Sequence, residues 1–497
     1  MIQTIKRKIH NFRADRQYCA DANFRIDHDV ISARQDDYAA LINDLCAEIE
    51  AYSPAPLTDH EKIPFDDYKI VSYNGDRMGK VFCRDGEYYR GVYQESVVDF
   101  TELWRKGIIQ VMGKRGYIPK TEITDFCLEE YPVILHAEKV QISTSLIWTY
   151  SMVKDAALHM IIMNSVLRRF GYKLHDGHLN NITFHNGKPL FTDLGSIVKD
   201  EGQKVSFEQE LVFSACYRMV FELIGKSALA RVQVYDENNN SVWIRPRAYN
   251  EQLREYRSAR DALFRLLVFR ANSRAKKMAR NIFDHHVLKP EEVELFFSHL
   301  CTAKDDVTCD CIVDKQLPSC MDRLCQVRSV ALVSCDDHDL LERLLAKGFS
   351  VSVTHYDEHI TEQLYNADYK KVRPNVFMFN YMYASSEDSR NSIKSDVVLA
   401  PDVTHGTGTV QRFRADSIMN SLGKLTYRYV VITYYPASAH NEKYICEMQS
   451  RDEENPDQML KAFKAQFVPV CIEKFWDEDR NLQGILMMGE KDEKSVQ

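Results

Sequence analysis

The sequence lacks the long apolar runs of membrane proteins. No stretch of about eighteen apolar residues occurs in it, so it offers no transmembrane helix. The basic N-terminus MIQTIKRKIHNFRADRQY also lacks the apolar segment of a signal peptide. We therefore expect a cytoplasmic protein without a transmembrane segment.

The sequence also lacks the paired Cys-x-x-Cys spacings that are typical of a zinc site. Its thirteen cysteines are an odd number spread along a long chain, which indicates a reducing compartment rather than a disulfide framework. Five of them crowd into one segment: Cys301, Cys309, Cys311, Cys320 and Cys325. We interpret this segment as a thiol-rich linker between domains, with zinc binding as the alternative.

The sequence also has no excess of basic over acidic residues. The formal net charge of −8 argues against a protein that binds nucleic acid through its phosphate backbone. Hydrophobic residues make up 45% of the chain and charged residues 27%, which is typical of a folded globular protein. A chain of 497 residues is too long for one core, so we expect two domains.

The first half combines a small sheet with helices. A helical pattern covers residues 36–52, and three short β-rich runs at 68–73, 80–83 and 88–93 predict a three-stranded meander. A long apolar helix follows over residues 149–170 and is closed by Gly171. Further helical patterns cover residues 207–225, 248–283 and 289–300.

The second half alternates β-rich and helical patterns, which predicts a parallel, doubly wound sheet. Two strand-like runs at 467–476 and 482–490 end the chain with no helix between them, so we expect an antiparallel hairpin at the sheet edge. The expected divisions are a helical extension, an α+β domain, the cysteine-rich linker and an α/β Rossmann-like domain: residues 1–60, 61–300, 301–325 and 326–497.

The chemistry of the first half is concentrated in YKLHDGHLNNITFHNGKPLFTDLGS, residues 172–196. Asp176 and Asn181 are followed by Asp193 across a predicted hairpin with the turn HNGK. Phosphoryl transfer needs a carboxylate at the acceptor hydroxyl and oxygen ligands for Mg²⁺, and this set supplies both. The structural alternative is that Asp176 caps a loop, Asn181 makes an Asx turn and Asp193 ends a strand.

The motifs DGHLNN and DLG resemble the catalytic loop and the metal motif of the protein-kinase and aminoglycoside-phosphotransferase superfamily. The resemblance implies a two-lobed kinase-like fold with ATP and Mg²⁺ as cofactors. Asp176 would then be the catalytic base, and Asn181 and Asp193 would be the metal ligands.

The same resemblance suggests where a nucleotide would bind. The turn NGDRMGKV lies where the superfamily has its glycine-rich loop, with Gly75 and Gly79 as the permissive positions. Arg90 falls at the position of the phosphate-binding Lys, although Arg and Lys differ in geometry. Lys80 is the second candidate for this role.

The strand order of the second half resembles the class I S-adenosylmethionine methyltransferases. By that resemblance Asp357 in SVSVTHYDE would bind the cofactor ribose. The glycine turn after the first strand is replaced by residues that include Asp336 and Asp337, so the glycine loop is degenerate. His405 falls near the end of the fourth strand, where an exposed loop histidine is the simpler interpretation.

The order of the two halves resembles bacterial methyltransferase-like proteins that are related to nodulation and surface-glycan genes. The main hypothesis is an ATP- and Mg²⁺-dependent phosphotransferase acting on a small molecule or glycan, with a methyltransferase-like domain appended. The first alternative is an S-adenosylmethionine-dependent methyltransferase, active in glycan or small-molecule modification, with a degenerate kinase-like domain. The second is a non-catalytic binding protein or scaffold. A protein partner or homo-oligomer is compatible with each.

Overall fold

The computed structural model describes a large part of the chain. The described residues are 28–53, 63–71, 77–201, 211, 232–235, 241–244, 290–291, 327–335, 337–355, 358–369, 372–379, 381–382, 390–401, 414–435, 456–476, 480 and 482–491. We call residues 28–201 the first unit and residues 327–491 the second unit. Gly75, Asp357, His405, the cysteine-rich segment 301–325 and nearly all of the helices expected between 207 and 300 lie outside the described residues.

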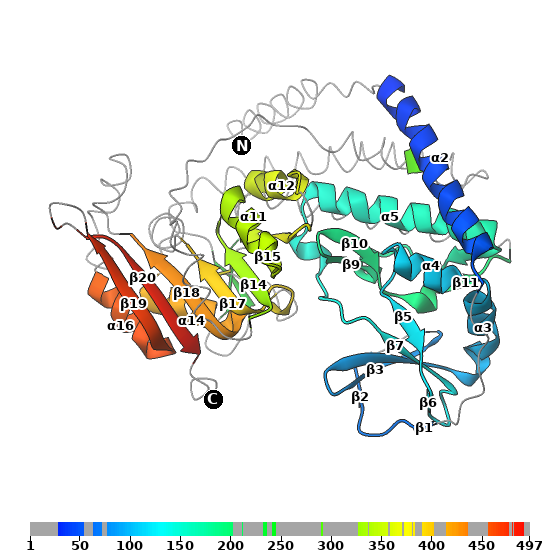
Figure 1. Cartoon of the computed structure of the whole chain (residues 1–497), viewed down its shortest axis with the longest axis horizontal. Helices are drawn as coiled ribbons and strands as arrows, with labels where there is room; N and C mark the ends of the chain where they lie inside the picture. The colour runs from blue at the N-terminus through cyan, green and yellow to red at the C-terminus, as the bar shows by residue number, and fades with distance from the viewer. Residues whose placement is uncertain are drawn as a thin grey trace, which may run out of the picture.

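A five-stranded antiparallel sheet occupies one end of the first unit (Figure 1). Its strands, in spatial order, are β2 (Lys69–Ile70), β3 (Gly79–Arg84), β4 (Glu87–Val92), β7 (Val133–Ala137) and β5 (Thr121–Ile123). The predicted meander is confirmed as β2, β3 and β4. Asp85 and Gly86 both have positive φ in the turn between β3 and β4, which suits a tight hairpin. The short strands β1 (Ile63–Pro64) and β6 (Phe126–Cys127) pair beside this sheet.

Four helices accompany this sheet: α2 (His28–Ala51), α3 (Val97–Arg105), α4 (Ile108–Lys114) and α5 (Tyr150–Arg169). The longest apolar pattern of the first half becomes α5, and its residues from Met152 to Leu167 are largely buried. Gly171 follows it with φ 80°, a left-handed conformation that favours glycine. The predicted long helix and its stop are therefore confirmed. The helix predicted over residues 36–52 is also present, but α2 starts earlier, at His28.

After α5 the chain forms two small antiparallel pairs. β8 (Tyr172–Leu174) pairs with β11 (Ile197–Lys199), and β9 (Ile182–His185) pairs with β10 (Lys188–Phe191). Asn186 and Gly187 make the turn between β9 and β10 with positive φ, so the predicted HNGK hairpin is confirmed. Farther along, β12 (Val232–Tyr235) and β13 (Ser241–Ile244) form a hairpin that the helical patterns did not predict.

The second unit is a seven-stranded sheet in the order β16-β15-β14-β17-β18-β20-β19. The strands are β14 (Ser329–Val333), β15 (Ser350–His355), β16 (Asn375–Met378), β17 (Ser395–Ala400), β18 (Thr426–Tyr434), β19 (Phe467–Trp476) and β20 (Leu482–Lys491). The described helices between them are α11 (His338–Ala346), α12 (Glu358–Asn366), α14 (Ala415–Leu425) and α16 (Pro456–Gln466).

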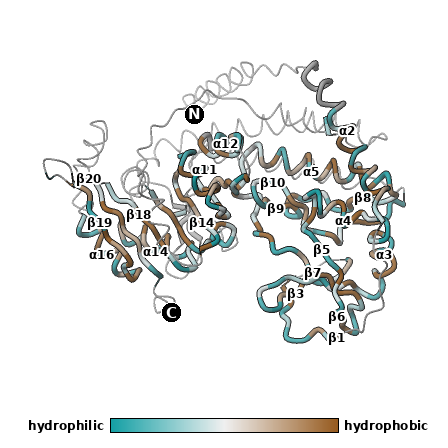
Figure 2. Tube along the Cα trace, viewed as in Figure 1, coloured by the Kyte–Doolittle hydropathy of each residue, from teal (hydrophilic) through white to brown (hydrophobic). Residues whose placement is uncertain are grey.

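The first five of these strands are parallel, and β20 is antiparallel to both β18 and β19. Strands β14 and β17 are almost completely buried, as strands covered on both faces must be. Hydrophobic residues follow these strands and α5 in Figure 2. The predicted Rossmann-like sheet and its terminal hairpin are confirmed, and β19 forms the edge.

The two units share one hydrophobic core and several polar contacts. The Gly187 N–H of the β9–β10 turn donates to Asn375 Oδ1 at the start of β16, at 3.0 Å. Ser392 Oγ donates to the carbonyl of Ile142 at 2.6 Å. The first unit therefore packs against the β15–β16 side of the second sheet (Figure 1).

The described helices include none that is both long and apolar enough to cross a membrane.

The β9–β10 turn gives a first prediction. We expect Gly187→Ala to destabilise the protein more than Gly86→Ala, because both glycines have positive φ but only Gly187 is enclosed. A Cβ on Gly187 would lie 2.6 Å from both Arg373 Cβ and the Pro374 carbonyl oxygen. A Cβ on Gly86 would have no atom of the described residues within 4 Å.

The conformational cost alone is about 1 kcal/mol, and overpacking adds roughly 1 to 3 kcal/mol. Denaturant unfolding of the two variants measures the difference. Equal losses of unfolding free energy would contradict the close packing of this turn against the second unit.

Candidate functional site

Two segments of the first unit meet beside the β9–β10 hairpin. The loop after β8 carries Asp176, and the segment after β10 carries Asp193. The His175 N–H donates to the Ser196 carbonyl at 2.8 Å, and the Asp176 N–H donates to Ser196 Oγ at 2.9 Å. These hydrogen bonds bring the two segments side by side.

A further hydrogen bond joins the Asn181 end of the first segment to the start of the second segment. The Thr192 N–H donates to the carbonyl of Asn181 at 2.9 Å. Asn181 ends the short helix η3 (Leu179–Asn181), and Asp193 immediately precedes η4 (Leu194–Ser196). The structure thus gathers the backbone positions of all three predicted residues in one region.

The side chain of Asp176 also has a local structural role. Asp176 Oδ1 accepts the His178 N–H at 2.9 Å, which is the loop cap expected as the structural alternative. The Asn181 Nδ2 atom is buried and has no hydrogen-bond partner in the part of the chain that is described. A buried amide nitrogen without a partner is unusual, because buried polar groups are normally satisfied.

The oxygen-rich donor set suits Mg²⁺, which prefers carboxylate and amide oxygens. Within the described residues no group of three His, Cys, Asp or Glu side chains is placed to bind a metal. A metal here would therefore depend on Asp176, Asn181 and Asp193, two carboxylates and one amide.

The charge of Arg77, a residue that the sequence patterns do not single out, acts on this loop. Burial lowers the pKa of His175, and the positive charge of Arg77 lowers it further, while Asp176 acts in the opposite direction. Arg77 lies two residues before the start of β3 at Gly79, in the segment NGDRMGKV. Only the tertiary structure brings the charge of Arg77 near the Asp176 loop.

The two candidate phosphate-binding residues lie on opposite faces of the five-stranded sheet. Lys80 is opposite Gly91 in the neighbouring strand, whereas Arg90 is opposite Val81. Because successive residues of a strand point to opposite faces, Lys80 and Arg90 cannot serve the same site from this sheet. Arg90 is only 8% exposed and shares its face with Leu135, which belongs to the main core.

Gly79 has a steric role in the sheet. The carbonyl oxygen of Gly91 occupies the space that a Cβ at Gly79 would need. The close approach of β3 and β4 therefore requires glycine at this position, whether or not a ligand binds beside it.

The second unit has its own candidate site where β14 ends. Ser334 follows β14 with φ 52°, and its N–H donates to the Thr354 carbonyl at 2.8 Å. Left-handed backbone is the conformation that glycine usually supplies in such a turn. The turn thus adopts a glycine-like conformation although the sequence has no glycine there.

Asp337 has a structural role that explains part of the unusual sequence of this turn. Its Oδ1 accepts the Leu340 N–H at 3.0 Å and so caps the N-terminus of α11. An Asp directly before a helical pattern is an N-cap signal that could have been identified from sequence. Of the two acidic residues that replace the glycine turn, Asp337 therefore has a structural role as a helix cap.

No protein-family model matches the chain, and no curated protein matches it. Among solved structures, the chain is similar to PH0226 from Pyrococcus horikoshii OT3, with 13% identity over 36% of this chain and 88% of that chain and a TM-score of 0.27.

Two methyltransferase structures are also similar. The N-methyltransferase NodS from Bradyrhizobium japonicum WM9 is 8% identical over 34% of this chain and 87% of its own, with a TM-score of 0.25. The magnesium protoporphyrin IX methyltransferase ChlM from Synechocystis PCC 6803 with bound SAM is 11% identical over 35% of this chain and 74% of its own, also with a TM-score of 0.25. The fold assignment rests on the strand order of the seven-stranded sheet itself, which is Rossmann-like.

The turn after β14 gives a second prediction. We expect Ser334→Gly to stabilise the protein by about 0.5 to 1 kcal/mol, because glycine takes positive φ without the strain of a side chain. In the matched variant Ser334→Val we expect the free energy of unfolding to fall by at least about 1 kcal/mol, since a β-branched residue rarely adopts positive φ. Denaturant unfolding of both variants measures the effect, and a loss of stability in Ser334→Gly would contradict the assigned backbone conformation.

Proposed function

We propose that the chain is an S-adenosylmethionine-dependent methyltransferase, with the cofactor at the carboxyl ends of β14 and β15. The observation that carries this proposal is the seven-stranded sheet, in which β14 is followed by β15 on one side and by β17 on the other. In open α/β sheets, ligands bind at the carboxyl ends of the strands where the strand order reverses. That position in this chain is next to Ser334.

At this edge of the sheet Ser334 fits the cofactor, whereas the acidic residues after it depart from the usual glycine-rich turn. Ser334 supplies the left-handed backbone of the turn with a small side chain, which supports a close approach of a ligand to the backbone. Asp336 and Asp337 add negative charge, although Asp337 is used as a helix cap. By the family resemblance, Asp357 would bind the ribose hydroxyls.

When bound, S-adenosylmethionine would supply an activated methyl group. The protein would orient the cofactor through the Ser334 turn and Asp357 and would bring an acceptor to the same edge of the sheet. By the resemblance to methyltransferase-like proteins related to nodulation and surface-glycan genes, the acceptor would be a glycan or a small molecule. The sequence alone favours the phosphotransferase. The seven-stranded sheet and the conformation of the Ser334 turn support the methyltransferase instead.

Calorimetric titration of the full chain with S-adenosylmethionine tests this proposal. We expect saturable binding in the wild type and at least a tenfold weaker affinity in Asp357→Ala, since a ribose hydrogen bond to a carboxylate is worth about 1.5 to 3 kcal/mol. The control is Asp416→Ala, which removes an exposed acid in the first turn of α14. The absence of any binding heat with the wild type at millimolar cofactor would remove the proposal.

A second candidate is an ATP- and Mg²⁺-dependent phosphotransferase centred on Asp176. It is favoured by the hydrogen bonds that bring the Asp176 loop beside the Asp193 segment. In this proposal Asp176 is the base, Asn181 and Asp193 bind the metal, and the first unit is a kinase-like domain.

Arg90 supports this second candidate better than Lys80. It lies on the third strand of the sheet, β4, and helix α3 follows, as the phosphate-binding Lys and the αC helix do in kinases. Gly75 and Gly79 would belong to the loop over the phosphates. Arg77 would add positive charge beside that loop.

Phosphate transfer and ATP turnover test the second candidate. We expect Asp176→Asn and Asp193→Ala each to lower turnover by roughly 100-fold or more, because one removes the base and the other a metal ligand. Asp85→Asn is a matched control, since Asp85 is an exposed turn residue. Turnover that is equal in the wild type and both variants would exclude this site.

If neither ligand binds and neither reaction occurs, the remaining interpretation is a non-catalytic binding protein or scaffold.

A further inference from the structure

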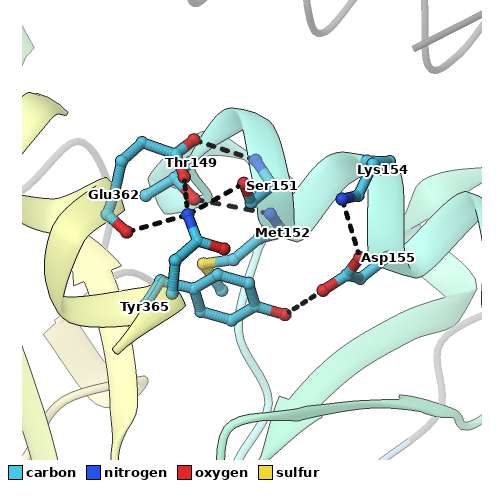
Figure 3. Close-up of polar contacts among 8 residues, drawn as sticks. Thr149, Ser151, Met152, Lys154, Asp155, Glu362 and Tyr365 are labelled. Carbon is cyan, nitrogen blue, oxygen red and sulfur yellow. Dashed lines mark hydrogen bonds and ion pairs between the residues drawn. The ribbon is translucent and has the colours of Figure 1, made fainter. Parts of the chain in front are cut away.

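Helix α12 of the second unit lies against the N-terminal end of α5 in the first unit (Figure 3). It begins at Glu358, close after β15 ends at His355, so its first turn is at the carboxyl edge of the sheet. Thr361, which is fully buried, donates from Oγ1 to the His355 carbonyl at 3.3 Å. The position of α12 is therefore linked to the end of β15.

Glu362 of α12 caps α5. The Ser151 N–H, in the first turn of α5, donates to Glu362 Oε1 at 2.8 Å. The first N–H groups of a helix have no partner within the helix, and a negative charge there is favourable. Thr149 satisfies a second such group, the Met152 N–H, from within the first unit. The N-terminus of α5 is thus completed by a carboxylate from the other unit.

Asn366 keeps this carboxylate in place. Its Nδ2 donates to Glu362 Oε2 at 3.0 Å and to Ser151 Oγ at 3.2 Å. One turn of α12 therefore bridges to α5 through two side chains.

Tyr365 makes a second, more buried contact. Its hydroxyl donates to Asp155 Oδ2 at 2.8 Å, and the tyrosine is only 3% exposed. Burial raises the pKa of Asp155, while Lys154 and Arg373 act in the opposite direction. The Tyr365 ring also meets the Phe184 ring of β9 edge-on, with centroids 6.0 Å apart. Removing the hydroxyl would leave the partly exposed Asp155 carboxyl group without this donor, at a cost in stability.

We infer that Glu362 and Tyr365 are positioning residues: they fix α12 against α5 and thereby fix the carboxyl end of β15 for cofactor binding. The link to the cofactor rests on the proposed methyltransferase function. The first unit is then required for the second unit to bind its ligand, even without chemistry of its own.

Hydrogen exchange on the full chain tests the positioning directly. We expect amides of α12 and of the first turn of α5 to exchange about tenfold faster in Tyr365→Phe and in Glu362→Ala, because each variant removes a hydrogen bond to a charged or buried group. Amides of β18 and β20 should be unchanged, which shows that the variants remain folded. Glu362→Gln keeps an acceptor for the Ser151 N–H and should restore most of the protection.

Cofactor affinity is the second measurement. At a temperature where all variants are folded, S-adenosylmethionine should bind several-fold more weakly to Tyr365→Phe and Glu362→Ala than to Glu362→Gln or the wild type. Unchanged exchange in α12 would overturn the inference, and so would faster exchange with unchanged affinity.

A wild type that binds no S-adenosylmethionine would instead remove the proposed function. The link to the cofactor would be overturned with it, and the exchange data would still decide whether α5 positions α12.

Discussion

The burial of α5 is the interaction on which the rest of the structure depends. Most residues of this helix from Met152 to Leu167 are buried, so it is stable only when other elements cover it. Helix α2, strands β8 and β10, and helix α12 of the second unit all contact it. Because elements of both units cover α5, the two units are joined around it rather than linked only by the chain.

The same helix lies between the two candidate sites. Its C-terminal end leads through Gly171 and β8 into the Asp176 loop, while its N-terminal end is capped by Glu362 of α12. Helix α12 in turn starts at the carboxyl edge of the second sheet. A disturbance of α5 would therefore reach both regions through direct packing and hydrogen bonds, without any larger rearrangement.

Much of this organisation could be predicted from local patterns. The periodicity of α5, the HNGK turn and the alternation of strands and helices after residue 327 each depend on neighbours in sequence, and each is present as expected. Asp337 as an N-cap could have been predicted as well, because it precedes a helical pattern. The opposite faces of Lys80 and Arg90 could not, since they depend on how β3 and β4 are paired. The Arg77 charge beside His175 depends on the packing of the sheet against the loop.

The amino-acid sequence by itself determined many of the elements, among them α5, the HNGK hairpin and the alternating strands and helices of the second unit, because helix, strand and turn preferences act over a few residues. It also determined which side chains were candidates for chemistry, including Asp176, Asn181 and Asp193. Only the tertiary structure decided that Ser334 adopts a glycine-like backbone and that Glu362 completes a helix in the other unit. Both depend on contacts with residues that are distant in the chain, Thr354 for Ser334 and Ser151 for Glu362. Such contacts exist only after the chain has folded, and no local pattern encodes them.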